Sequence, residues 1–73
     1  MIKHKKGALR VESHERRHFI SVPAGRALDL HYYLRSNRIP SAPPEPSFDG
    51  VDCIELPRTI DVDAVQTLLN AWS

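Results

Sequence analysis

A short apolar run, a proline and an amphipathic helical stretch follow one another twice along this chain. The first copy is Phe19-Ile20-Ser21-Val22-Pro23 followed by residues 24–37, and the second is Cys53-Ile54-Glu55-Leu56-Pro57 followed by residues 61–72. Apolar, β-branched runs are typical of strands, and strands that alternate with helices usually form parallel pairs. This order predicts two parallel strands, with both strand-to-helix loops at one edge of the sheet.

Each helical stretch carries apolar residues at helical spacing, which predicts that one face of each helix is buried. These residues are Ala27, Leu30, Tyr33 and Leu34 in the first stretch, and Val65, Leu68, Leu69 and Trp72 in the second. Asp61 precedes the second stretch and is a favourable N-cap residue, so we expect that helix to begin there.

The chain before the first helical stretch predicts a β-hairpin. Leu9 and Val11 alternate with polar residues in 8–12, and the polar residues 13–17 then allow the chain to turn back onto Phe19–Val22. Residues 40–50 are rich in proline, and we expect a stiff loop there, with Phe48 docked on the core.

The predicted fold is α/β (α+β): a small single-layer sheet of about three strands in the order β-β-α-β-α, similar to a split βαβ unit. Both helices are expected on one face of this sheet. Residues 1–7 are expected to form a flexible basic arm, and residues 8–73 a single small domain. The second face of the sheet would be uncovered unless another copy packs on it, which favours a homodimer.

Composition narrows the classes of function. The chain has 73 residues and a net charge of +1, so no strong overall field attracts nucleic acid or a membrane. Its one cysteine, Cys53, excludes an internal disulfide and is consistent with a reducing compartment. No apolar run approaches the roughly 20 residues that cross a bilayer. We expect a cytoplasmic protein without a cofactor or a membrane partner.

The clearest short motif is His14-Glu15-Arg16-Arg17-His18. Over these five residues it resembles the H-E-x-x-H motif of the zincin metalloproteases, a resemblance that implies His14 and His18 as zinc ligands and Glu15 as the general base. Both variable positions are arginine here, and the string leads directly into a strand-like run without a third ligand at a recognisable spacing. The expected structure is a solvated charged turn, and metal binding is the weaker hypothesis.

A second candidate site depends on the predicted parallel strands. The loops after Val22 and Leu56 would meet at one edge of the sheet, where ligands of open α/β sheets usually bind. Gly25 would allow close approach of the backbone, and Arg26, Arg58 and Thr59 would bind a small anion at two helix N-termini.

The leading functional hypothesis is a non-catalytic binding or protein-interaction module that associates with itself or with another protein. The first alternative is nucleic-acid binding through the basic N-terminal arm, with Arg35 and Arg38 on phosphates and Tyr32 stacked on a base. A zinc-dependent hydrolase built on His14 and His18 is the third hypothesis.

Overall fold

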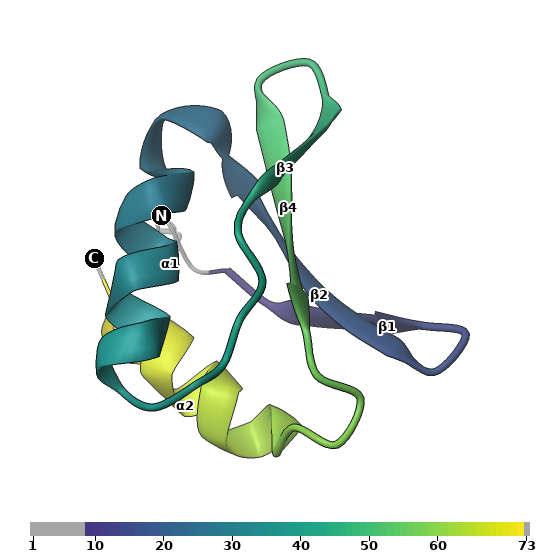
Figure 1. Ribbon diagram of the computed structural model, residues 1–73, viewed down its shortest axis with the longest axis vertical. Coiled ribbons are helices and arrows are strands. Elements are labelled where there is room, and N and C mark those ends of the chain that lie inside the picture. The colour runs from purple at the N-terminus through teal and green to yellow at the C-terminus, as the bar shows by residue number, and fades with distance from the viewer. Residues whose placement is uncertain (1–8, 73) are drawn as a thin grey trace, which may run out of the picture.

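The computed structural model describes residues 9–72 as four strands and two helices in mixed α+β order (Figure 1). The elements in chain order are β1 (Val11–His14), β2 (Arg17–Pro23), the 3-10 turn η1 (Ala24–Arg26), α1 (Ala27–Ser36), β3 (Glu45–Phe48), β4 (Val51–Leu56) and α2 (Val62–Ala71). The predicted β-β-α-β-α order therefore lacked one strand. The predicted arm, residues 1–7, lies outside the described residues.

The sheet has the strand order β1-β2-β4-β3, and every neighbouring pair is antiparallel. The expectation that the strands ending at Val22 and Leu56 are parallel is wrong. A parallel pair needs a crossover that returns the chain to the same end of the sheet. Here the chain leaves α1, forms β3 at the edge of the sheet, and reaches β4 through a tight hairpin, which reverses the direction of β4.

The missing strand, β3, lies inside the segment predicted to be a loop. Pro46 lies opposite Asp52, and the register then shifts by a bulge before Phe48 pairs with Val51. Proline is tolerated in a sheet at an edge strand or a bulge, and Pro46 occupies both. Gly50 has a φ of 71° and allows the two-residue turn that leads into β4.

β2 and β4 are related by an approximate two-fold axis perpendicular to the sheet. Ile20 pairs with Ile54 at the middle of the ladder, Val22 lies opposite Asp52, and Leu56 lies opposite His18. Each strand is the second strand of a hairpin and leads through a proline toward a helix. The sequence repeat is thus a β-β-α unit, and an axis in this direction keeps both helices on the same face.

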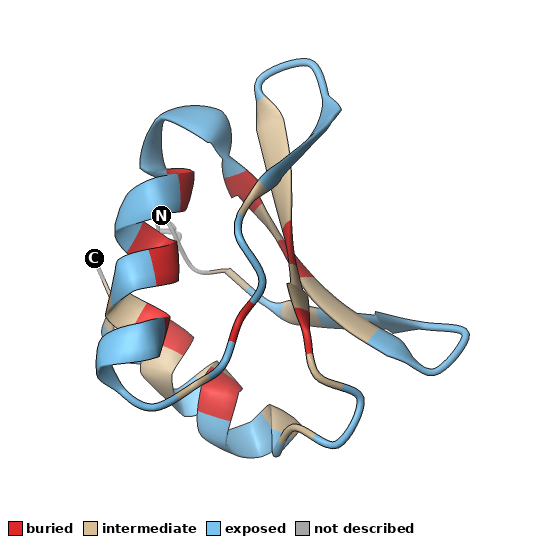
Figure 2. Ribbon diagram, viewed as in Figure 1, coloured by how far each residue is buried: buried red, intermediate tan, exposed pale blue. Residues whose placement is uncertain are grey.

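The core lies between that face and the two helices, as the buried residues show (Figure 2). Its members come from both central strands and both helices: Ile20, Val22, Ala27, Leu30, Leu34, Ile54, Leu56, Val65 and Leu69. The predicted apolar faces of the helices are confirmed at these positions. Placing both helices on one face, as predicted, leaves the other face of the sheet without a covering layer.

α2 begins as its sequence predicts, because the backbone N–H of Ala64 donates to Oδ1 of Asp61 at 3.1 Å. The two helices are joined at their sides. The hydroxyl of Tyr33 donates to the carbonyl of Leu68 at 2.9 Å, and the Tyr33 and Trp72 rings lie 6.2 Å apart. These contacts set how α2 lies against α1 and complete the half-buried rim of the core.

Candidate functional site

The His14–His18 motif forms a hairpin turn and not a helix. His14 ends β1, Arg17 begins β2, and the turn residues Glu15 and Arg16 have φ angles of 51° and 70°. Two successive positive φ angles are those of a type I′ turn, which matches the right-handed twist of a hairpin. The expected charged turn is confirmed.

This turn separates the two histidines that the motif would use for zinc. His14 lies opposite Arg17 and His18 lies opposite Ser13, so the two side chains point to opposite faces of the hairpin. Nδ1 of His18 is 2.7 Å from the hydroxyl of Ser13, and Nε2 of His14 is 3.8 Å from the carboxylate of Glu15. No group of three metal-ligating side chains occurs within residues 9–72. The geometry of a zincin helix is therefore not present here.

The predicted anion site is divided by the antiparallel pairing. Pro23 pairs with Val51 and His18 with Leu56, so the loops after β2 and β4 lie at opposite ends of the ladder. Gly25 and Arg26 belong to η1 at one end, and Arg58 and Thr59 form the turn before α2 at the other. The four residues do not converge, and the geometric basis for a shared anion site is absent.

Two of these residues have local surroundings that differ from the predicted roles. A Cβ at Gly25 would meet no atom within 4 Å, so no close approach of backbone requires glycine there. The guanidinium carbon of Arg26 lies 4.2 Å from the centre of the Trp72 ring, a cation–π contact that links η1 to the end of α2.

The structure brings a different set of side chains together on the uncovered face of the sheet, called here the open face. Alternation along the strands places Phe19, Cys53 and Glu55 on this face, and the β3 bulge adds Phe48. A shallow hollow of about 290 Å³ crosses it, lined by His14, Arg17, Phe19, Ser47, Cys53 and Glu55. Phe48 is 67% exposed, so the expectation that it docks on the core is wrong.

The lining of the hollow combines a charged pair, Arg17 and Glu55, with the less polar side chains of Phe19 and Cys53. Arg17 donates two hydrogen bonds to the Glu55 carboxylate, each 2.9 Å long, and these bonds hold the pKa of Glu55 below its ordinary value. Partial burial raises the pKa of the Cys53 thiol, with the Glu55 and Glu45 charges adding to the effect. Cys53 is therefore a neutral thiol at pH 7, suited to contact and not to nucleophilic attack.

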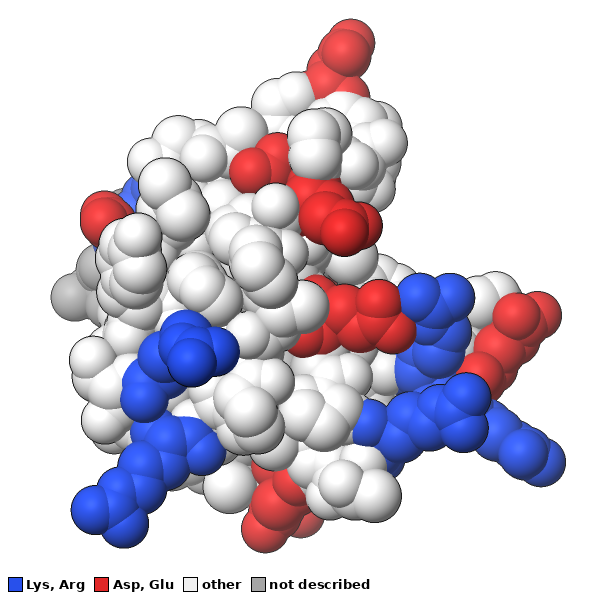
Figure 3. Space-filling model, in the orientation of Figure 1, with Lys and Arg blue, Asp and Glu red and all other residues white. Residues whose placement is uncertain are grey.

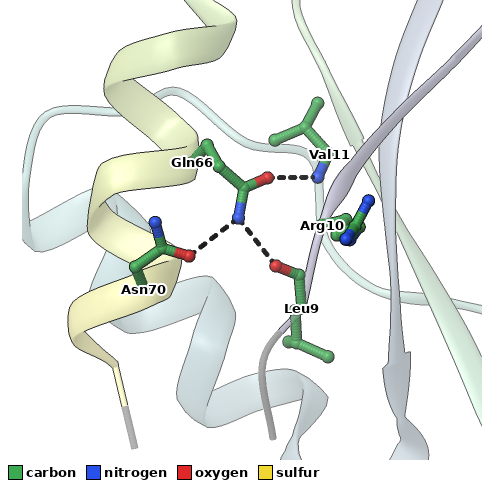
Figure 4. A pocket seen from close by; sticks show the side chains of 5 residues that line it. All are labelled: Leu9, Arg10, Val11, Gln66 and Asn70. Atoms are coloured by element: carbon green, nitrogen blue, oxygen red, sulfur yellow. Dashed lines mark hydrogen bonds between the residues drawn. The ribbon is translucent and has the colours of Figure 1, made fainter. Parts of the chain in front are cut away.

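Each edge of the sheet is blocked at one place to a further strand. At β1, the side chain of Gln66 accepts from the N–H of Val11 at 3.0 Å and donates to the carbonyl of Leu9 at 2.8 Å (Figure 4). Asn70 accepts a further hydrogen bond from Gln66 at 3.0 Å. These are the bonds that an added strand would make with residues 9–11. At the other edge, Pro46 has no N–H to offer.

Phe48 was predicted only as a core contact, and no role was predicted for Gln66. Phe48 is a large apolar residue of the kind usually buried in a core, and the bulge in β3 turns its side chain to the open face. Gln66 lies next to the buried Val65 on α2, a position where a polar side chain at the edge of an apolar stripe can signal a specific partner. Gln66 binds the backbone of Leu9 and Val11, and backbone groups cannot be recognised from residue types in the sequence.

Comparisons with protein-family models, with curated proteins and with solved structures found no match to this chain. Neither helix in the described part of the chain has the length and apolar character needed to cross a bilayer.

Proposed function

We propose that this protein is a non-catalytic interaction module that associates with a second copy of itself through the open face. The observation that carries the proposal is the one-sided covering of the sheet, which leaves Phe19 and Cys53 lining an unfilled hollow and Phe48 exposed on the same face. Burial of such apolar area contributes about 25 cal/mol per Å².

The partial blocking of both edges favours contact through the face over strand addition. Gln66 occupies the N–H of Val11 in β1 and the carbonyl of Leu9 just before it, and Pro46 supplies no N–H in β3. A partner strand that pairs with β1 would have to displace the Gln66 side chain, and one that pairs with β3 would lose a hydrogen bond at Pro46. A partner that packs a flat face on the open face breaks no hydrogen bond within the protein.

The charges at the two ends of the sheet support a second copy as the partner. The end with the β1–β2 turn carries Arg16, Arg17 and Arg58 against Glu15 and Glu55, of which Glu55 is paired with Arg17, whereas the end with the β3–β4 turn carries Asp49. Figure 3 shows acidic side chains and no basic ones around the β3–β4 turn at the top of the view. A two-fold axis across the strands brings the acidic end of one copy to the basic end of the other.

Sedimentation equilibrium between about 10 μM and 1 mM tests this proposal, because a dissociation constant in that range corresponds to about 4–7 kcal/mol. We expect the mass to rise from that of a monomer toward twice that value. Phe48→Ser should return the protein to a monomer without lowering its melting temperature, since Phe48 is largely exposed.

Tyr32→Ser is the matched control, because Tyr32 is 61% exposed but lies on α1. It should leave the dimer intact. Asp49→Lys should weaken association, and adding Arg16→Glu to that variant should restore it if opposite ends meet. A wild-type protein that stays monomeric at about 1 mM overturns the proposal, as does a Phe48→Ser protein that still dimerises.

A further inference from the structure

An exposed patch at the C-terminal end of α1 stands apart from the open face. It consists of Tyr32, Arg35 and Arg38, and we call it the α1 patch. Arg35 and Arg38 line one shallow hollow together with Ile39 and Pro40. Tyr32 precedes Arg35 by three residues on the helix, so the two side chains are neighbours, and Tyr32 is 61% exposed.

The two arginines are not engaged by the fold. Within residues 9–72, the structure records no ion pair or side-chain hydrogen bond for either of them. Basic side chains lie next to each other over the lower end of α1, with no acidic side chain between them, in Figure 3. The dipole at the C-terminal end of α1 favours a cation in the last turn, where Arg35 lies, and acts less on Arg38, which lies beyond the helix end.

The backbone at Arg38 is an independent sign that its side chain has a use. The N–H of Ile39 donates to the Leu34 carbonyl at 2.9 Å, and the N–H of Arg38 donates to the Arg35 carbonyl at 3.0 Å. These two bonds form a Schellman motif, in which the residue at the position of Arg38 is usually glycine. Arg38 has a φ of 66°, a conformation that disfavours every side chain with a Cβ. The fold would be more stable with glycine, so the arginine is not explained by folding.

We propose that the α1 patch binds single-stranded nucleic acid, with phosphates on Arg35 and Arg38 and an unpaired base stacked on Tyr32. Guanidinium groups form paired hydrogen bonds with phosphate oxygens, and an exposed aromatic ring stacks on any base. A ring with two unengaged guanidinium groups fits this ligand better than it fits an acidic peptide such as polyglutamate, which offers carboxylates to the arginines but no aromatic ring to stack on Tyr32. The patch does not involve the open face, so this inference stands or falls independently of self-association.

Fluorescence anisotropy with a labelled eight-nucleotide oligo(U), at about 20 mM salt, tests the inference at protein concentrations where sedimentation shows the monomer. We expect saturable binding whose logarithmic salt slope is about −0.7 for each phosphate contact. Arg38→Gly should raise the melting temperature, weaken binding several-fold and make the slope less steep by about 0.7. A gain in stability together with a loss of affinity excludes misfolding as the cause.

Arg16→Gly is the matched control, because Arg16 has a φ of 70° and lies in the β1–β2 turn at the far end of the molecule (Figure 1). It removes the same charge and relieves the same strain, and it should leave the affinity unchanged. Tyr32→Ala should weaken binding about tenfold, and Tyr32→Phe should restore it because stacking needs only the ring.

Three outcomes overturn the inference. The first is no binding at low salt, and the second is an equal loss of affinity in Arg38→Gly and Arg16→Gly. The third is equal affinity for oligo(U), for a duplex of the same length and for a polyglutamate of the same charge. That result would show that the patch binds any polyanion and does not recognise unpaired bases.

Discussion

At the scale of single residues, the Arg17–Glu55 pair is the best-defined charged contact of the open face. The two hydrogen bonds from Arg17 are the largest cause that lowers the pKa of Glu55 from its ordinary value of 4.5. Both side chains are largely exposed, so the pair contributes little to the stability of the monomer. Its more important effect is to hold two opposite charges in fixed positions beside the hollow.

Arg17→Gln should therefore raise the pKa of Glu55 toward 4.5. In the wild-type protein, the contribution of the pair is complete above that ordinary value and is lost as the pH falls through the lowered one. A titration of the Glu55 carboxyl by carbon-detected NMR measures the change. Arg58→Gln serves as the control and should move the pKa less, because Arg58 acts on Glu55 only through space. An unmoved Glu55 titration in Arg17→Gln would contradict the assigned cause.

At the scale of elements, the fold joins its first strand to its last helix through one side chain. Gln66 uses both ends of its amide on the backbone of residues 9–11, and α2 thereby takes the place of a fifth strand at that edge. The helix is fixed at its side by Tyr33 and at its end by the contact of Arg26 with Trp72. α2 is thus held by contacts with β1, η1 and α1 in addition to its buried apolar stripe.

Gln66→Glu should lower the free energy of unfolding by about 1–3 kcal/mol. A carboxylate can still accept from the Val11 N–H, but it repels the Leu9 carbonyl that the amide donates to. Urea denaturation measures the loss. Asn70→Ala removes only the side-chain partner of Gln66 and should cost well under 1 kcal/mol. Equal stability of Gln66→Glu and the wild-type protein would show that the amide does not hold this edge.

The sequence predicted correctly the features that depend on neighbouring residues in the chain, and it failed for the features that depend on which strands pair. The Asp61 cap, the buried stripe of α2 and the turn at Glu15 and Arg16 depend on neighbours in the chain, and all were predicted. β3 was missed because Pro46 is a breaker in most strands and is tolerated only at an edge. That omission reversed the direction assigned to β4.

The failure at β3 also explains the failure of the predicted anion site. Gly25 and Arg58 meet only if β2 and β4 run in the same direction, and a hairpin between β3 and β4 makes them opposite. The open face depends on the bulge that turns Phe48 outward, which no residue type indicates. Tyr32, Arg35 and Arg38 of the α1 patch were named from the sequence as candidate nucleic-acid contacts, and only the positive φ of Arg38 required the structure.

At the scale of the whole molecule, the approximate two-fold symmetry concentrates the packing at one point. Ile20 and Ile54 pair across β2 and β4 close to the axis, and each is 0% exposed. Each hairpin thus supplies one isoleucine to the same place in the core, beneath both helices. A domain of this size has about 4–11 kcal/mol of stability in total, so a loss at this point affects the whole fold.

Ile20→Val and Ile54→Val should each lower the free energy of unfolding by about 0.5–1.5 kcal/mol, and by similar amounts, because the two side chains occupy equivalent places. The double variant should not equal the sum of the two, because neighbouring side chains share the space that one methylene leaves. Urea denaturation with an unchanged m-value gives all three energies. Val65→Ala in α2 is the comparison, since Val65 is equally buried but lies on a helix. Strongly unequal losses at Ile20 and Ile54 would show that the symmetry of the ladder does not extend to the energetics of the core, whereas matched and coupled losses would show that the two β-β-α units share one core.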